Sequence, residues 1–446
     1  MVETKTKNKN IFWLWSNVID FQKRGDVVYW LPTFSTTAHL SHKLSDVAKL
    51  SDLRFNPNES ENDIFSYIDI SNINIFNGSY EKTEIKNAYA PSRARKKLKR
   101  FDVIVSTVRP NRNATSIILE DTNDLVCSTG FAVLQAIKIN PYYLFVFTKT
   151  PYFIDQLVRQ TSATMYPAVN ENDILNVGLS IPPEKDQQKV ELIIKEVFQL
   201  QKESEEEYKE ASLILENSIK EFFITDNQKP FWKWNDDIEI IKTLEPNFWR
   251  KTISSKKHPV IKFGDIFNYQ KGTEVGSALY QDNGIPFLRV SDLGDLEIQS
   301  GNSSKYINET LFNKLKNEFQ PHKGELLFSK DATIGLMAKV DTEEKQIISS
   351  GILRLQIKQK DFDTDFLTAF LTNKFINQEF VKNSTGSVIK HLNPAKLSKI
   401  ELPLVDKKIQ TEISIKIKSF LLKRQLSKQK LQEAKDFVEN LIVNNK

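Results

Sequence analysis

The sequence predicts a mixed α+β protein, in which two tandem globular domains are separated by two long antiparallel coiled-coil helices and are related by an approximate two-fold axis. Three observations lead to this fold class. A pattern that contains all six tryptophans occurs twice in the 446 residues. Each copy holds short runs of strand-forming residues, and each copy ends in a long segment of helical apolar spacing. A fixed internal period sets the architecture of a chain.

The tryptophan pattern establishes the repeat. The first copy carries Phe12-Trp13, Trp15 and Trp30, and the second carries Phe231-Trp232, Trp234 and Trp249 at a constant shift. The same shift relates His39 to His258. Recurring aromatics of this kind either anchor a partner, because tryptophan is enriched at interface hot spots, or lie in a core. We expect a core position for these tryptophans.

The repeat continues towards the C-terminus. Tyr67-Ile68-Asp69-Ile70-Ser71 parallels Phe287-Leu288-Arg289-Val290-Ser291, and Ser128-Thr129-Gly130-Phe131 recurs as Ser349-Ser350-Gly351-Ile352. A period of this length exceeds that of solenoid repeats, so each copy is expected to be a whole domain. The expected boundaries are residues 1–183 for the first domain, 184–225 for a first spacer helix, 226–404 for the second domain and 405–446 for a second spacer helix.

The globular part of each copy reads as strands and turns. Runs rich in Val, Ile, Phe and Tyr alternate with clusters of Asn, Gly, Asp and Ser up to about residue 182, and again from about 226 to 403. This alternation predicts short strands joined by turns, with a few helices.

The end of each copy is predicted to be helical. After Ile181-Pro182-Pro183, neither glycine nor proline interrupts the chain before Pro230, and the apolar spacing is that of a helix. A helix of roughly 35 to 40 residues is about 55 Å long. Its apolar stripe is expected to pair with its twin, although two separate helices that each lie on their own domain remain the alternative. The residues assigned to the helix pair are Val190, Ile194, Val197, Phe198 and Leu215 in the first helix, and Ile413, Ile417, Phe420, Leu431 and Phe437 in the second.

Composition narrows the class of protein. The chain is 40% hydrophobic and 27% charged, with a mean hydropathy of -0.40, which suits a soluble protein of two domains. One cysteine, Cys127, excludes a disulfide framework and a cysteine-built metal site. The sequence contains neither a signal peptide pattern nor an apolar run of membrane length, so we expect a cytoplasmic protein.

Positive charge is concentrated in one part of the first domain. The net charge of +5 is only mildly basic. The basic residues before and after one predicted strand are Arg93, Arg95, Lys96, Lys97, Lys99, Arg100, Arg109 and Arg112. Acidic residues such as Glu203 and Glu207 instead lie on the first long helix. This distribution fits a domain that contacts phosphates beside a spacer that does not, and it equally fits a solvated lysine-rich face.

Motifs for catalysis and metal binding are missing from the sequence. It lacks a glycine-rich phosphate loop, a dinucleotide fingerprint and a His-Glu-x-x-His pattern. The five histidines show no ligand spacing. The expectation is therefore a chain without catalytic residues, metal ligands or a cofactor of its own.

Several segments in fixed order resemble one family. In the second copy they run from Gly284 to Leu293, from Lys323 to Gly335, through Gly386-Ser387 and His391-Leu392-Asn393, and end at the Leu402-Pro403 entry to a long helix. This series closely resembles the target-recognition domain of Type I restriction-modification specificity subunits. The first copy carries a divergent form, with Ser106-Thr107-Val108-Arg109-Pro110 and Ser128-Thr129-Gly130-Phe131.

The resemblance implies a non-catalytic subunit that binds double-stranded DNA. Each target-recognition domain would read one half of a split sequence, and the helices would form the spacer. Two methyltransferase (modification) subunits would dock on the chain, joined in the larger restriction and adenine-methylation complex by restriction (motor and nuclease) subunits. S-adenosylmethionine, ATP and Mg would belong to those partners. The alternatives are a nuclease with unrecognised catalytic carboxylates and a coiled-coil scaffold that joins proteins.

The residues expected to contact DNA come from charge and from the resemblance. Arg is the commonest bidentate reader of guanine, which favours the stiff turn after the predicted strand. The residues assigned to DNA are Arg93, Arg95, Lys96, Lys97, Lys99, Arg109 and Arg112 in the first domain, and Arg289, Lys330, Thr333, Lys390 and His391 in the second.

Two departures from the family pattern stand out. Relatives often place Glu-Gln shortly after the proline that opens each long helix, where this chain has Asp186-Gln187 and Ile409-Gln410. If these positions contact methyltransferases, the two docking sites are unequal. The first copy is also expected to lack a counterpart of Thr333-Ile334-Gly335 and to read different bases with a different loop.

Overall fold

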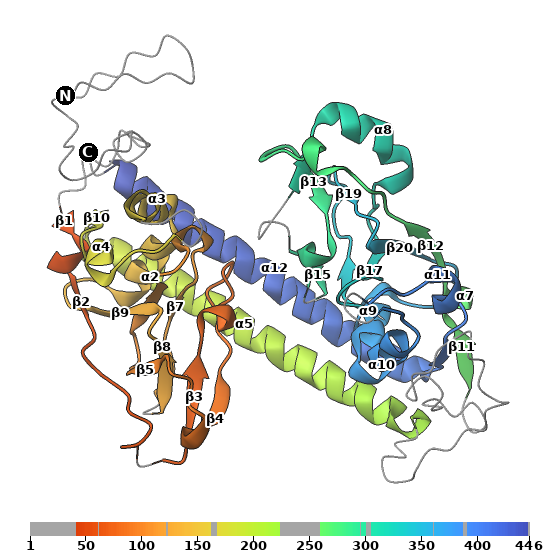
Figure 1. The fold of residues 1–446 in the computed structure, drawn as a ribbon, viewed down its shortest axis with the longest axis horizontal. Coiled ribbons are helices and arrows are strands. Elements are labelled where there is room, and N and C mark those ends of the chain that lie inside the picture. Colours follow the sequence, from red (N-terminus) through yellow and green to blue (C-terminus); the bar gives the residue numbers. More distant parts are fainter. Residues whose placement is uncertain are drawn as a thin grey trace. The chain divides into compact units, whose positions relative to one another are not determined.

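The computed structural model describes residues 42–60, 62–121, 124–161, 167–223, 259–294, 296–299, 305–359, 361–386 and 390–444. All six tryptophans, His39 and His258 lie outside these ranges, as does the expected boundary near residue 225. Two compact units are seen (Figure 1). Unit 1 comprises the described residues up to Gln201 and from Arg424 onwards, and unit 2 runs from Lys202 to Lys423.

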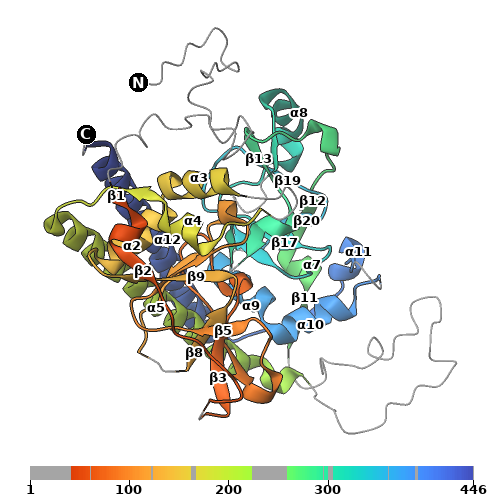
Figure 2. The ribbon, with the colours of Figure 1, turned by 60° about the vertical axis from the view of Figure 1, so that its left-hand side comes forward.

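The main sheet of unit 1 is antiparallel and has the order β2-β9-β6-β7. Its strands are β2 (Ala48–Leu50), β9 (Phe131–Ala136), β6 (Val103–Ser106) and β7 (Thr115–Ile117). Helices α2 (Pro141–Lys149) and α4 (Glu171–Leu175) pack against strands of this sheet, and α3 (Pro151–Gln160) packs against both helices (Figure 2). Asn140 starts α2 because its side chain accepts a hydrogen bond from the Tyr142 amide and Pro141 occupies the first turn.

A second sheet of unit 1 has the order β4-β3-β8-β5, in which β3 and β8 are parallel. Its strands are β4 (Thr83–Lys86), β3 (Ile64–Ile68), β8 (Leu125–Ser128) and β5 (Ala94–Lys97). A short pair joins β1 (His42–Lys43) to β10 (Gly178–Leu179). The 3-10 turns are η2 (Leu44–Asp46), η3 (Ile70–Asn72), η4 (Asn87–Tyr89) and η5 (Pro110–Arg112).

Unit 2 repeats this arrangement. Its main sheet has the order β12-β20-β17-β18, formed by β12 (Phe267–Lys271), β20 (Ile352–Ile357), β17 (Leu326–Ser329) and β18 (Met337–Lys339). A second sheet has the order β16-β13-β19, formed by β16 (Lys305–Ile307), β13 (Ile285–Leu288) and β19 (Ile347–Ile348). The strands β13 and β19 are parallel, as β3 and β8 are in unit 1.

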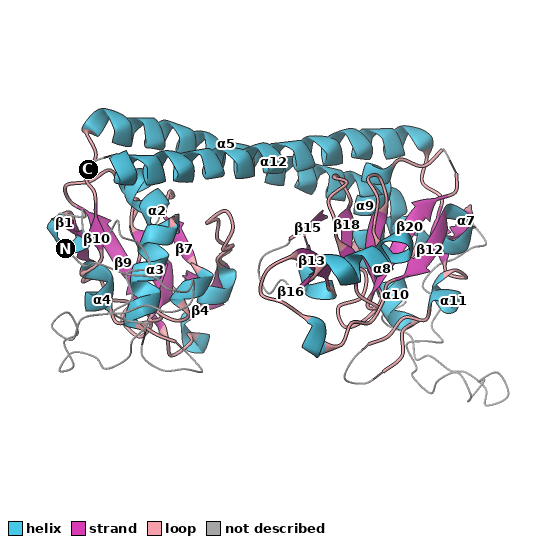
Figure 3. Ribbon diagram, turned by 90° about the horizontal axis from the view of Figure 1, so that it is seen from above, coloured by secondary structure: helices cyan, strands magenta, loops and turns pink. Residues whose placement is uncertain are grey.

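The remaining elements of unit 2 complete the correspondence. Short pairs join β11 (Val260–Lys262) to β21 (Glu401–Pro403) and β14 (Leu293–Gly294) to β15 (Glu297–Ile298). The helices are α7 (Phe263–Ile266), α8 (Glu309–Phe319), α9 (Thr364–Thr372), α10 (Lys374–Lys382) and α11 (Pro394–Leu397), and the 3-10 turns are η8 (Ser277–Leu279) and η9 (Val290–Asp292). Helix α9 packs against β18 (Figure 3), as α2 packs against β7. The predicted mixed α+β fold is confirmed.

The two long helices are α5 (Glu184–Ile219), which continues into η6 (Lys220–Phe222), and α12 (Lys407–Asn444). In unit 1 the first half of α5 lies beside the second half of α12 (Figure 1), where Gln201 Nε2 donates to Ser427 Oγ at 3.3 Å. In unit 2 the second half of α5 lies beside the first half of α12, where the Tyr208 and Phe420 rings are 5.1 Å apart. The helices therefore run antiparallel in both units, as predicted.

The seam between the helices is also part of each unit's core. Val190, Ile194, Val197 and Leu431 are buried in one cluster with the strands and helices of unit 1, and Leu215, Ile413, Ile417 and Phe420 are buried likewise in unit 2. Phe198 and Phe437 are half-buried against the unit 1 cluster. The helices thus pack on each other and on their domains together, which joins the two predicted arrangements. Within the described residues, no helix is long and apolar enough to span a membrane.

Candidate nucleic-acid interface

Each unit builds the same loop directly after a buried strand of its main sheet. Loop 1 comprises residues 107–113 and follows β6, and loop 2 comprises residues 330–335 and follows β17. The sequence did not predict what holds these loops in place. In both units the loop is bonded to two segments that are distant in sequence.

Three backbone hydrogen bonds fix loop 1. The Thr107 amide donates to Gly130 O at 2.8 Å, and the Arg109 amide donates to Pro167 O at 2.7 Å. In return, the Val169 amide donates to Thr107 O at 2.9 Å. The start of loop 1 is therefore bonded on two sides. One side is the turn between β8 and β9, and the other is residues 167–169 before α4, which we call the gripping segment of unit 1.

Loop 2 makes the same three bonds. The Lys330 amide donates to Gly351 O at 2.9 Å, the Ala332 amide donates to Lys390 O at 2.9 Å, and the Leu392 amide donates to Lys330 O at 2.8 Å. The gripping segment of unit 2, residues 390–392, leads into α11. Asn393 caps the start of α11, just as Asn170 caps α4. Both loops are therefore positioned by the same set of bonded segments, which we call the frame of each unit.

Both loops also contain left-handed residues at equivalent places. Near the start, Arg109 has a φ of 51° and Ala332 a φ of 59°; near the end, Asn113 has a φ of 52° and Gly335 a φ of 85°. Residues other than glycine adopt this conformation rarely and at a cost. The two loops thus share their ends, but loop 1 has one residue more and carries the 3-10 turn η5 where loop 2 has Thr333 and Ile334.

The side chains that the two loops present have different chemistry. In loop 1, Arg109 is half-buried and Arg112 is exposed, and buried Pro110 sets the turn between them. In loop 2, Thr333 is exposed. The gripping segment of loop 2 adds Lys390, which is half-buried, and His391, which is 58% exposed.

The assignment of Lys330 to DNA needs correction. Its side chain is buried, and its Nζ donates to Asp331 Oδ2 at 2.6 Å. Asp331 Oδ1 lies 3.0 Å from His391 Nδ1. Lys330 thus supports Asp331 and His391 from beneath, and His391 is the more accessible member of this group.

The basic cluster of unit 1 is divided by the alternation of β5. Arg95 and Lys97 are half-buried on one side of the strand, whereas Lys96 is buried on the other, because successive side chains of a strand point to opposite faces. Lys96 Nζ forms an ion pair with Glu171 and donates to Phe131 O. The prediction that Lys96 contacts phosphate is therefore replaced by a structural role, in which Lys96 ties β5 to α4 and β9.

The remaining basic residues lie at two ends of the sheets. Arg93 is exposed. It lies beside loop 1, because its carbonyl accepts a hydrogen bond from the Thr129 amide, and the next residue, Gly130, accepts one from the Thr107 amide of loop 1. Lys99 is exposed but precedes β6, so it lies at the end of that strand opposite to loop 1. The structure therefore places Arg93 near Arg109, and it does not bring Lys99 to the same edge.

Arg289 lies at the corresponding edge of unit 2. Its amide donates to Asp292 Oδ2 at 2.8 Å and starts η9, as the Asp69 amide donates to Asn72 Oδ1 in unit 1. The Ser349 amide donates to Leu288 O at 2.8 Å, which ties this strand end to the turn that also holds Lys330. Burial raises the pKa of Asp292.

The glutamines that open the two long helices point inwards. Gln187 Nε2 donates to Pro182 O at 2.9 Å, and Gln410 Nε2 donates to Val405 O at 2.8 Å; both side chains are buried. Ile409, which stands where relatives place an acid, packs against the core of unit 2. Gln187 and Gln410 thus fix the entry to each helix from within, so a surface contact with a partner is not their role.

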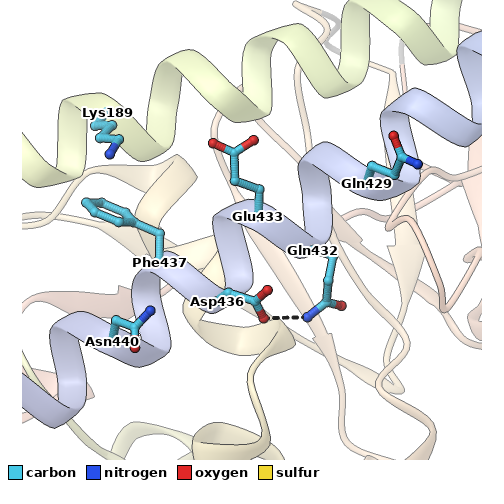
Figure 4. A pocket seen from close by; sticks show the side chains of 7 residues that line it. All are labelled: Lys189, Gln429, Gln432, Glu433, Asp436, Phe437 and Asn440. Atoms are coloured by element: carbon cyan, nitrogen blue, oxygen red, sulfur yellow. Dashed lines mark hydrogen bonds between the residues drawn. The ribbon is translucent and has the colours of Figure 1, made fainter.

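The outer faces of the long helices carry large apolar side chains. Leu192 in α5 is 68% exposed, and Ile415 at the equivalent position of α12 is 65% exposed. In unit 1, Lys189 and Phe437 also line an open groove of about 540 Å³ between the helices (Figure 4), with Lys189 Nζ 4.2 Å from the centre of the Phe437 ring. Sequence reasoning did not single out these surfaces.

Two observations concern metal binding and cysteine reactivity in the described residues. In that part of the chain, no group of three or more His, Cys, Asp or Glu side chains is placed to hold a metal ion. Burial raises the pKa of the Cys127 thiol to about 12, as expected for an inert cysteine in a buried strand.

Comparison with known proteins points to one family. Residues 256–436 match the family model of the Type I restriction modification DNA specificity domain. The specificity subunit of the Type I restriction enzyme HindI from Haemophilus influenzae is 26% identical over 156 residues, which are 33% of this chain and 33% of that subunit. The chain thus aligns with about a third of the length of this curated relative.

Solved structures of similar chains cover most of the molecule. The HsdS subunit from Thermoanaerobacter tengcongensis is 22% identical, with 91% of this chain and 95% of that chain covered and a TM-score of 0.33. The S subunit of a Type I restriction-modification system from M. genitalium is 12% identical, with 90% and 94% covered and a TM-score of 0.39. The family model covers residues 256–436, within the second copy, which is thus similar to the Type I restriction modification DNA specificity domain. The first copy repeats the strand order of the main sheet, the loop and the long helix.

Proposed function

We propose that this chain is the sequence-specific DNA-binding subunit of a Type I restriction-modification complex and acts on DNA in the cytoplasm. Each unit reads one half of a bipartite duplex target, and the chain itself carries out no chemical step. S-adenosylmethionine, ATP and Mg are bound by the partner subunits. The observation that carries the proposal is the loop that each unit holds with the same three backbone hydrogen bonds and that presents different side chains in each unit.

A fixed backbone with variable side chains suits the reading of two unrelated half-sites. Sequence is read by a few side chains that reach base edges, whereas phosphate contacts set the register. Loop 1 offers the guanidinium groups of Arg109 and Arg112, which match the acceptors of guanine in the major groove. Loop 2 and its gripping segment offer Thr333, Lys390 and His391. Arg93, Arg95, Lys97 and Arg289 are assigned to phosphates or flanking bases, and Lys99, at the end of β6 opposite to loop 1, is assigned to phosphates only.

The paired helices provide the docking surfaces for two methyltransferase subunits, and restriction subunits join in the larger complex. Leu192 and Ile415 support this assignment, because each helix presents an exposed apolar side chain at the equivalent position, where an apolar anchor of a partner could pack. Replacing Leu192 or Ile415 by Asp is expected to weaken co-purification of the methyltransferase that docks at that helix start.

Selection from a duplex library tests the function. The purified full chain, incubated with duplexes that carry two randomised blocks around a variable spacer, is expected to enrich two separate sequence blocks. Its affinity for any duplex is expected to fall with salt, since released counterions drive binding. A chain that binds duplexes without salt dependence or sequence preference, or that cleaves them with Mg alone, contradicts the proposal.

A further inference from the structure

We infer that each reading loop is shaped in advance by one polar side chain of the neighbouring helical hairpin, so that Lys149 in unit 1 and Asn377 in unit 2 are positioning residues for base recognition. The inference rests on the proposed function. It adds to that function two residues that do not touch DNA and that are not among the residues assigned to it.

In unit 1 the end of α2 is tied to the end of loop 1. Buried Lys149 donates from Nζ to Asn113 O at 3.3 Å and to Ile75 O at 3.2 Å. In the opposite direction, Asn113 Nδ2 donates to Thr148 O at 2.9 Å. Helix α3 packs against η5, the turn that carries Arg112. Two reciprocal bonds and a helix therefore hold the far end of loop 1.

Loop 1 needs this support because of its backbone. Arg109 and Asn113 both adopt left-handed conformations, with φ values of 51° and 52°. Such conformations persist only where the surroundings determine them more than once. The backbone bonds at Thr107 and Arg109 fix the start of the loop, and Lys149 and Thr148 fix its end. Without Lys149, the carbonyl of Asn113 keeps the Thr115 amide as a donor but loses its tie to α2, and the turn between the two arginine side chains is held less firmly.

Unit 2 reaches the same result with a different residue. In element order, Thr372 at the end of α9 takes the place of Lys149, but its hydroxyl donates within its own helix to Thr368 O at 3.0 Å. The support comes instead from α10, where Asn377 Nδ2 donates to Ile334 O at 3.0 Å. Gly335 leaves the room for this amide, because a Cβ there would lie 2.0 Å from Asn377 Nδ2.

The two supporting residues, Lys149 and Asn377, do not occupy equivalent positions of the repeat. The three backbone bonds at the start of the loop occur in both copies, whereas the supporting residue is a lysine on the first hairpin helix in unit 1 and an asparagine on the second hairpin helix in unit 2. An ordinary core contact in the repeat is expected to keep its position in both copies. A support that is matched to the side chains of its own loop is expected to differ, because the reading side chains must be held within about 0.5 Å of their productive geometry.

Lys149→Met and Asn377→Ala in the full chain separate the two supports, and each variant is the control for the other. In the randomised duplex selection, Lys149→Met should reduce discrimination in one sequence block about tenfold and leave the other block within about twofold. Asn377→Ala should do the reverse. Binding to a fixed non-target duplex at low salt should stay within about twofold of wild type for both, because phosphate contacts are kept.

Hydrogen exchange provides a second measurement that does not depend on DNA. The amides of Arg112 and Asn113 should exchange at least tenfold faster in Lys149→Met, and the amides of Ile334 and Gly335 in Asn377→Ala, while strands β6 and β17 remain protected. Loss of preference in both blocks, or in neither, with unchanged loop exchange overturns the inference. A wild-type chain that shows no sequence preference instead overturns the proposed function, and the inference falls with it.

Discussion

Lys96 and Lys97 are neighbours in sequence and carry the same charge, yet β5 turns them to opposite faces. The basic cluster could be predicted from the sequence, but the accessibility of its members could not. β5 is a strand that the sequence did not indicate, and its short length and its irregular pairing with β8 hide the alternation. Only the structure shows that Glu171, far along the chain, partners Lys96.

This difference predicts two kinds of variant. Replacing Lys97 and Lys99 by Gln should lower the affinity for all duplexes alike and flatten the dependence of log K on log salt by roughly 0.9 for each phosphate that is no longer neutralised. Lys96→Met should leave that slope unchanged and instead lower the free energy of unfolding by about 1 to 3 kcal/mol, because buried Phe131 O loses a donor. Fluorescence titrations at several salt concentrations, together with urea unfolding, distinguish the two. A salt slope that responds to Lys96 and not to Lys97 and Lys99 would show that the accessible face has been misassigned.

Lys149 gives a prediction on pH. Burial, and secondarily the charge of Lys435, lowers the pKa of Lys149 from 10.5 to about 7. Between these values the unfolded chain binds one proton more than the folded chain, so the free energy of unfolding rises with pH, by up to about 1.4 kcal/mol per pH unit. Below pH 7 the full penalty for the buried charge applies. Urea unfolding of wild type and Lys149→Met from pH 7.5 to 9.5 should give curves that diverge, with wild type gaining. Parallel curves would mean that Lys149 keeps its proton in the fold.

At the scale of elements, the long helices were the most predictable parts. A run without glycine or proline and with helical apolar spacing has few other ways to fold, and the observed bounds of α5 and α12 follow it closely. The loops were not predictable in the same way. Loop 1 is fixed by Gly130, Pro167 and Lys149, and loop 2 by Gly351, Lys390 and Asn377, and these contacts depend on sheet order rather than on local pattern.

The helix seam predicts a strong dependence on side-chain burial. Val197→Asp in unit 1 and Phe420→Asp in unit 2 each place an unpaired charge in a buried cluster, at a cost of several kcal/mol. Both variants should lose several kcal/mol in the free energy of unfolding and release their docked partner. Leu192→Asp is the matched control on the same helix, because this side chain is exposed. Leu192→Asp should unfold like wild type in urea and still lose its partner; a seam variant as stable as Leu192→Asp would show that the seam does not hold the helices.

At the scale of the whole molecule, the two copies share their backbone arrangement and differ in the side chains of their loops. Sheet order, the parallel pair in each second sheet, the three loop bonds and the capped helix after each gripping segment occur twice. Buried backbone bonds tolerate little change, since each unpaired group is costly, whereas exposed loop side chains are free to diverge. The repeat could therefore be predicted from its core positions in the sequence. The side chains of the two loops could be compared only in the structure, where Arg109 aligns with Ala332 and Asn113 aligns with Gly335.

The division of labour between the units gives the last prediction. Arg112 is exposed on loop 1 and His391 is exposed beside loop 2, and each belongs to the frame of its own unit. Arg112→Ala should relax the preference in one block of the target by roughly 1 to 3 kcal/mol for each base that the side chain no longer reads, with the other block unchanged. His391→Ala should act on the other block only. Methylation or binding profiles across randomised half-sites measure both effects, and Lys330→Met, which removes a buried support of Asp331, should resemble His391→Ala. If Arg112→Ala and His391→Ala change the same block, the two loops meet one half-site together, and the frame that they share serves a single reader.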